Sequence, residues 1–256
     1  MAKEQEENGN GSSSLLVELP LREAAEGFEL EKAICSHGLF MLAPNHWDPI
    51  SRSFSRPLRL TSPPLTVTVR ISQPPTSSSS TLYLRVYGAS SLSPPHRHSL
   101  LNQVSRMLRL SESEENKVRE FRSIVEALHG EEEATEYLRS FSGRVFRSPT
   151  LFEDMVKCII LCNYAFIFDT DLESEQVQVH SKSCTVQTVG RDVELIYAKY
   201  APFQFLAYWA EMWHFYGQRF GKLSELPVSD YKFITASNMK NKKIATRKRS
   251  KTSAEE

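Results

Sequence analysis

Four carboxylate side chains lie close together in the stretch FDTDLESE, at Asp169, Asp171, Glu173 and Glu175. Clustered carboxylates can bind a divalent metal ion, or they can serve as the acid and the base of a catalytic site. Spacing alone favours a solvated acidic loop over either kind of site. The chemistry of this stretch therefore depends on the elements that would position it.

Two pairs of possible metal ligands stand elsewhere in the chain. Cys158 and Cys162 lie four residues apart in an apolar run, and His96 and His98 belong to the stretch PPHRH. A metal site needs further ligands at workable spacing, and none stand near the cysteine pair. We therefore expect the cysteines to be small buried side chains, the histidines to be solvated and no metal to be bound.

Motifs of several common enzyme classes are absent from the sequence. There is no H-x-E followed by C-x-x-C, as in zinc deaminases, and no G-x-S-x-G, as in serine hydrolases. There is also no phosphate-binding P-loop and no G-x-G-x-x-G of dinucleotide-binding folds. The sequence thus predicts no cofactor.

The composition is that of a globular protein. The chain has 256 residues, of which 40% are hydrophobic and 24% charged, enough for one large domain or two small ones. No apolar run approaches the roughly 18 residues that span a bilayer, and the polar start MAKEQEENGNGSSS is not a secretory signal. Four cysteines do not make a disulfide framework here. We expect a reducing compartment and no membrane partner.

Basic residues are concentrated near the C-terminus, in the stretch KNKKIATRKRSK. This stretch suits a nuclear import signal or a nucleic-acid contact on a disordered tail, and the alternative is a merely solubilising tail. The rest of the chain is mildly acidic, which counts against a large DNA-binding face. The predicted DNA-binding residues are therefore those of the tail: Lys240, Lys242, Lys243, Arg247, Lys248 and Arg249.

The pattern of apolar residues changes at Pro94. Before it, alternating stretches rich in β-branched and aromatic residues predict an antiparallel sheet, with strands at 58–60, 65–71 and 81–88. After it, apolar residues three and four apart predict four helices, HSLLNQVSRMLRL, ENKVREFRSIVEALHG, EEEATEYLRSF and SPTLFEDMVKCIILC. Gly130 would end the second helix, and Thr150 with Glu153 has capping-box spacing at the start of the fourth. The run MVKCIILC is apolar almost all round, which predicts a central helix.

A further helix is predicted in APFQFLAYWAEMWHFYGQRFG, which contains eight aromatic residues. Phe205, Trp209, Trp213 and Tyr216 recur at steps of four, four and three, so they form one stripe on a helix. A stripe of this kind is more often part of a core than a ligand site.

Several of these stretches resemble the helix-hairpin-helix DNA glycosylase superfamily, most closely its plant members. FELEKAICSHGLFMLAPNHWDP, followed by RPLRL, is similar to the N-terminal segment of the family. RVFRSPTLFEDMVKCIILCN looks like the first helix of the catalytic domain, and YAPFQFLAYWAEMWHF looks like its closing helix. TDLE, at Thr170 to Glu173, resembles the segment that carries the catalytic aspartate. Together these stretches cover most of residues 28–237.

The resemblance implies a DNA N-glycosylase of base excision repair in the nucleus. Such an enzyme turns a damaged or unwanted base out of the duplex, and an aspartate stabilises the oxocarbenium-like sugar as the base leaves. Motif matching places that aspartate at Asp171. In the family, a glycine-rich hairpin between two helices grips the DNA backbone. The implied partner is double-stranded DNA, bound by a monomer.

The chain departs from the family pattern next to Asp171. Only eight residues, Asn163 to Thr170, separate Cys162 from Asp171, and two helices joined by a turn cannot fit in that interval. No glycine occurs between Gly143 and Gly190, so no degenerate hairpin lies there either. The simplest explanation is an internal deletion. It would weaken DNA binding and expose the apolar faces of the helices on both sides, which either pack against each other or remain as a large exposed patch.

The expected fold is α+β, a small N-terminal antiparallel sheet followed by a mainly helical, internally truncated glycosylase-like domain. The expected segments are a disordered N-terminus (1–14), a subdomain with the strands (15–93), a helical domain with the deletion near 163–170 (94–237) and a basic disordered tail (238–256). Two hypotheses follow, an aspartate-dependent glycosylase and a catalytically inactive variant that acts as a binding or regulatory module. A third is an interaction protein whose basic tail binds acidic partners.

Overall fold

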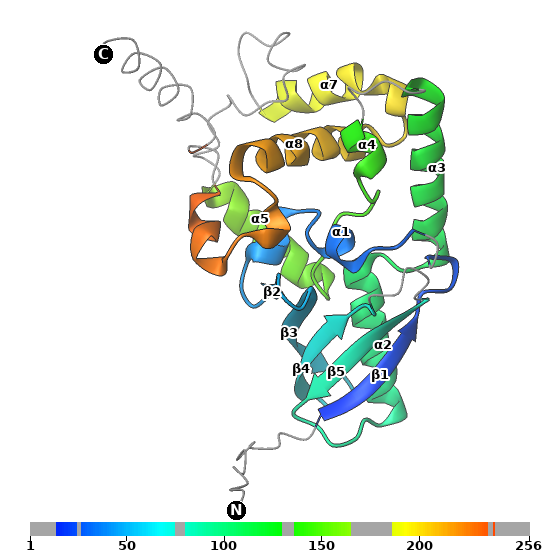
Figure 1. Cartoon of the computed structure of the whole chain (residues 1–256), viewed down its shortest axis with the longest axis vertical. Coiled ribbons are helices and arrows are strands. Elements are labelled where there is room, and N and C mark those ends of the chain that lie inside the picture. The colour runs from blue at the N-terminus through cyan, green and yellow to red at the C-terminus, as the bar shows by residue number, and fades with distance from the viewer. Residues whose placement is uncertain are drawn as a thin grey trace, which may run out of the picture.

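The computed structural model describes residues 14–24, 27–74, 80–129, 136–164, 186–234 and 238. Within these residues the fold is α+β, with one five-stranded antiparallel sheet at one end and most of the helices stacked toward the other (Figure 1). The expectations for the first 13 residues, for Gly130, for Asp171 and its neighbours, and for the basic tail lie outside the described residues.

The sheet has the strand order β1-β5-β4-β3-β2, and every neighbouring pair is antiparallel. The three strands expected from the alternating pattern are confirmed, although the first of them is longer than predicted. Two strands were not predicted, an edge strand on each side. The bounds are β1 (Ser14–Pro20), β2 (His46–Asp48), β3 (Ser53–Leu60), β4 (Leu65–Ser72) and β5 (Thr81–Tyr87).

One face of the sheet forms the larger core of the molecule. Inward side chains alternate with outward ones along each strand, as in Leu58 and Leu60 of β3 or Leu82, Leu84 and Val86 of β5, all buried. Helix α2 (Pro94–Leu108) covers this face and contributes Leu100, Val104, Met107 and Leu108 to the same core. In Figure 1 this helix passes behind the strands, and the outward face of the sheet is turned to the viewer.

The remaining helices form the second part of the fold. The longer ones are α3 (Glu112–His129), α5 (Leu151–Tyr164), α7 (Val186–Ile196) and α8 (Gln204–Phe220), and the short ones are α1 (Leu30–Ile34) and α4 (Glu136–Ser140). Short 3-10 segments accompany them: η1 (Arg22–Ala24), η2 (Gly38–Met41), η5 (Ala198–Tyr200), η6 (Leu223–Glu225) and η7 (Val228–Phe233). A smaller core joins α3, α4, α7 and α8 around Phe121, Val125, Leu138, Val193 and Ala207.

Helix α2 starts at Pro94, where the pattern of apolar residues changes, but one of its two histidines is not solvated as expected. Ser93 caps the helix by accepting a hydrogen bond from the His96 N–H, and prolines occupy the first two helical positions, where a missing N–H costs nothing. His98 is exposed, as expected, but His96 is buried. The His96 ring Nε2 lies 2.7 Å from the Pro63 carbonyl oxygen, so this histidine ties α2 to the β3–β4 turn.

The aromatic stripe of α8 packs the helix on the N-terminal segment. The indole N–H groups of Trp209 and Trp213 donate to the carbonyl oxygens of Ser36 and Cys35, at 2.9 and 2.8 Å. The two indoles stack on each other, and the second stacks on Tyr216. Phe205, at the start of the stripe, is 59% exposed, so the stripe is only partly a core.

Candidate functional site

The residues predicted to be catalytic or DNA-binding lie outside the described residues. Asp171 lies in the interval between α5 and α7, and the six basic residues of the tail follow residue 238. The candidate site is therefore built on α5, which leads directly into the acidic stretch. Its first turn is held as predicted, because the Thr150 hydroxyl accepts a hydrogen bond from the Glu153 N–H at 3.2 Å.

The charged side chains of α5 point into the protein. Glu153 accepts hydrogen bonds from the guanidinium of Arg56, at 2.9 and 3.1 Å, and lies 2.6 Å from the Lys157 Nζ. Arg56 is nearly fully buried and also donates to the side-chain oxygen of Asn45 at 3.0 Å. Burial raises the pKa of Glu153, but the hydrogen bonds from Arg56 and Lys157 outweigh it and hold the pKa below its usual value. Glu153 is thus an anchoring carboxylate.

A second ion pair fixes the first turn of α5 to α2. Arg106 donates to one carboxylate oxygen of Asp154 at 2.5 Å, and the other oxygen accepts the Ser148 N–H at 2.7 Å. Because Glu153 and Asp154 are bound to different elements, the helix cannot rotate about its axis without breaking one of the two pairs. Their partners therefore set which side of α5 faces outward.

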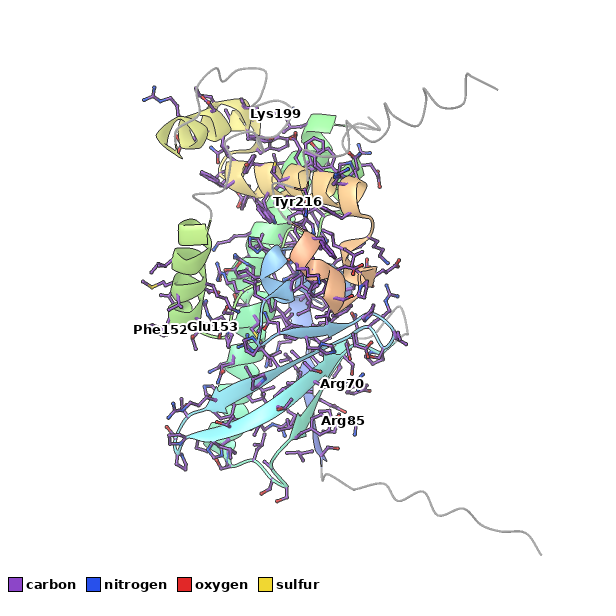
Figure 2. The ribbon with its side chains drawn as sticks, turned by 90° about the vertical axis from the view of Figure 1, so that its left-hand side faces the viewer. Arg70, Arg85, Phe152, Glu153, Lys199 and Tyr216 are labelled. Carbon is purple, nitrogen blue, oxygen red and sulfur yellow. The ribbon has the colours of Figure 1, made fainter. Side chains whose placement is uncertain are left out.

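The outward side of α5, called its bare side below, is apolar and exposed to solvent. Leu151, Phe152, Met155 and Ile159 are 65, 77, 54 and 57% exposed. Figure 2 shows Phe152 at the outer edge of the molecule, with the ribbon of α5 set apart from α8. The prediction of a central helix is wrong, because the helix buries its charged side and exposes its apolar one. Cys158 is also exposed, which corrects the expectation that it is buried.

The described residues contain a shallow pocket between α1, α4 and α8. It has a volume of about 170 Å³, and its walls include Lys32, Cys35, Tyr137, Trp213 and His214. Burial raises the pKa of the Cys35 thiol well above its ordinary value, so this thiol is not a nucleophile at neutral pH. The rings of Tyr137 and His214 stack at 5.0 Å, which closes one side of the pocket.

A buried carboxylate that the sequence reading did not single out lies next to this pocket. Glu211 is 4% exposed and accepts a hydrogen bond from the Tyr197 hydroxyl. Burial and the neighbouring carboxylate raise the pKa of Tyr200 to about 12, so this phenol stays neutral. The signal in the sequence was a single acidic residue within a mostly apolar and aromatic helix, which suggests a buried, hydrogen-bonded acid.

Neither a metal centre nor a membrane span is found in the part of the chain that the structure describes. No group of three or more metal-binding side chains comes together among these residues. None of the described helices combines the length and the apolar character needed to cross a bilayer. The candidate site therefore offers an apolar surface on α5, fixed by ion pairs on its inner side.

No protein-family model, no curated protein and no solved structure matched the chain. The likeness to glycosylases rests on the sequence stretches alone.

Proposed function

We propose that this chain is a glycosylase-like protein that binds a partner and does not excise bases, the second of the hypotheses above. The observation that carries the proposal is the bare apolar side of α5. The sequence supports it independently, because the eight residues between Cys162 and Asp171 leave no room for a helix-hairpin-helix.

The form of the bare side indicates the kind of partner. Leu151, Met155 and Ile159 are spaced by four residues, so they form one row along the helix, with Phe152 beside it. No charged side chain interrupts the row, since Glu153, Asp154 and Lys157 are held on the inner side. An apolar row of this kind is typical of a surface that packs against another amphipathic helix.

The resemblance to glycosylases adds a location, an oligomeric state and a DNA partner to the proposal. We propose a nuclear monomer that contacts double-stranded DNA weakly, through the basic tail. Asp171 is the catalytic residue of the competing hypothesis, in which the chain is an active glycosylase. The stretch TDLE is the observation that favours this second candidate.

Two measurements test the proposal. The first is a glycosylase assay on duplexes that carry an alkylated, an oxidised or a deaminated base, with Asp171→Asn as the matched variant. We expect no excision by either protein. Excision by the wild type that is lost in Asp171→Asn would establish the active enzyme and reject the proposal.

The second measurement tests whether the side of α5 is bare in solution. Phe152→Ala should change the free energy of unfolding by less than about 0.5 kcal/mol, as for an exposed residue without a specific role. Phe121→Ala is the matched control, because Phe121 is fully buried, and it should cost about 3–5 kcal/mol. A loss of that size in Phe152→Ala would show that the side of α5 is covered within the chain.

A further inference from the structure

The outward face of the sheet carries an unusual group of side chains. Tyr83, Arg85 and Tyr87 alternate with buried residues on β5, so all three stand on this face. Arg70 of β4 pairs directly with Arg85 in the sheet register, and Arg59 stands on the same face of β3. Figure 2 shows Arg70 and Arg85 on the same side of the sheet.

The pairing of the two arginines is unfavourable on its own. Directly opposite residues of an antiparallel pair have Cβ atoms about 5 Å apart, and like charges there destabilise the sheet. Arg70 is held by hydrogen bonds to the hydroxyls of Ser53 and Ser51, at 2.7 and 2.6 Å, and by Asp48 at 3.3 Å. Arg85 has only a 3.2 Å hydrogen bond to the Ser14 hydroxyl among the described residues and is exposed. Asp48 therefore offsets the charge of Arg70, and an anion bound beside Arg85 would offset the charge that remains.

The tyrosines define which anion fits. Tyr83 is 36% exposed, Tyr87 is partly exposed, and the two lie four residues apart on one strand, about 13 Å along it. Aromatic rings on a sheet stack well on unpaired bases, whereas the bases of a duplex are already stacked on each other. Arg85 lies midway between the rings, where the phosphates of a strand that joins two stacked bases would run.

We propose that the outward face of the sheet binds single-stranded nucleic acid, with Tyr83 and Tyr87 stacking on bases and Arg85, Arg70 and Arg59 contacting phosphates. The acid on this face of β1, Glu18, lies opposite Tyr83 on the edge strand. Its charge repels phosphates from the β1 side, so the nucleic acid would follow β5 from Tyr83 to Tyr87 and then turn toward Arg59 on β3. This site is independent of α5 and of the proposed function.

Binding of a fluorescent oligothymidylate to the full chain, measured by anisotropy across a salt series, tests the site. Tyr83→Ala and Tyr87→Ala should each weaken binding by about 5- to 100-fold, and the corresponding Phe variants should retain it. Arg85→Gln should reduce the slope of log K against log salt by about 0.7, the contribution of one phosphate contact to a single strand.

Control variants separate this site from the rest of the chain. Phe205→Ala removes an exposed aromatic ring from α8, and Arg191→Gln removes an exposed charge from α7, so neither should change the affinity. A variant with serine at every basic residue of 240–251 measures the contribution of the tail. All of the sheet variants replace outward side chains, and their melting curves should match that of the wild type.

Three outcomes would overturn the proposal. One is wild-type affinity in the Tyr83 and Tyr87 variants together with loss of binding in the tail variant. Another is tighter binding of a duplex of the same length than of the single strand. The third is that Arg85→Gln weakens the binding of anionic phosphatidylserine vesicles and of the oligonucleotide equally, while the tyrosine variants bind both as the wild type does. This would show a nonspecific basic surface.

Discussion

A histidine at the contact between the N-terminal segment and α8 should make the fold sensitive to mild acid. His37 stacks on the indole of Trp209 with 4.3 Å between ring centroids. Its Nδ1 accepts a hydrogen bond from the Leu39 N–H at 3.1 Å and so caps the 3-10 turn η2. Burial, with a smaller contribution from the charge of Arg109, lowers the pKa of His37 to about 4.

The direction of the effect follows from the protons bound in each state. The unfolded chain takes up a proton at His37 near the ordinary pKa of 6.5, while the folded chain excludes it down to about pH 4. Stability is therefore full above pH 6.5 and falls as the pH drops through this window. Between pH 7.5 and pH 5 the loss from this one histidine is at most about 2 kcal/mol. Protonation also removes the lone pair on Nδ1 that caps Leu39.

Urea denaturation at pH 7.5 and pH 5 measures this loss, with His37→Asn as the test variant. Asparagine keeps a side-chain oxygen that can cap the turn and does not titrate, so the variant should lose far less stability between the two pH values. His98→Asn is the matched control, because His98 is exposed on α2, and it should behave as the wild type does. An equal loss in His37→Asn and the wild type would refute the reasoning.

Three further predictions concern ion pairs and the core. Glu115→Gln should lower the free energy of unfolding by about 3–5 kcal/mol, because it leaves the buried guanidinium of Arg144 without the carboxylate that accepts its hydrogen bonds at 2.5 and 2.6 Å. A double variant, Glu115→Leu with Arg144→Met, should recover much of that loss. Burial raises the pKa of Glu31, but hydrogen bonds from Ser224, Arg52 and Lys222 outweigh it and lower the pKa to about 2. The stability that Glu31 contributes should therefore be lost as the pH falls from 4.5 toward 2. Melting curves in acid should show this loss in the wild type and not in Glu31→Gln. Phe54→Ala should cost about 3–5 kcal/mol in the same denaturation assay, because Phe54 is fully buried edge-on to Phe146.

Much of the fold could be predicted because the residues involved follow local rules. Alternation marks β4 and β5, and helical periodicity marks α2 from Pro94 onward. The edge strand β1 was missed because SLLVELP does not alternate cleanly. Leu16 stands on the outward face at 49% exposure, so an apolar residue occupies a position where the pattern calls for a polar one.

The candidate site could not be predicted because it depends on contacts between distant residues. Nothing in LFEDMVKCII shows that Glu153 meets an arginine 97 residues earlier in the chain, or that Asp154 meets Arg106. The prediction of a central helix used only the apolar composition of this stretch. The ion pairs to Arg56 and Arg106 determine instead that the charged side is inside.

The inverted orientation of α5 connects the sequence departure to the proposed function. Burying charges requires partners for them, and here both acids of the first turn have an arginine within 3 Å, so the acids on the inner side of the helix are paired. The outer side lies against no other described element, although its residues are those that a core would use. This is the arrangement expected under the proposed internal deletion, which would remove a packing layer and keep the elements that hold α5. A partner that covers this row would bind only the folded chain, so it would stabilise the fold by mass action and raise the melting temperature with its concentration. If the chain is the glycosylase-like protein proposed above, this layer would be the one that holds the hairpin in that family, and one internal deletion would explain both the exposed side of α5 and the missing hairpin.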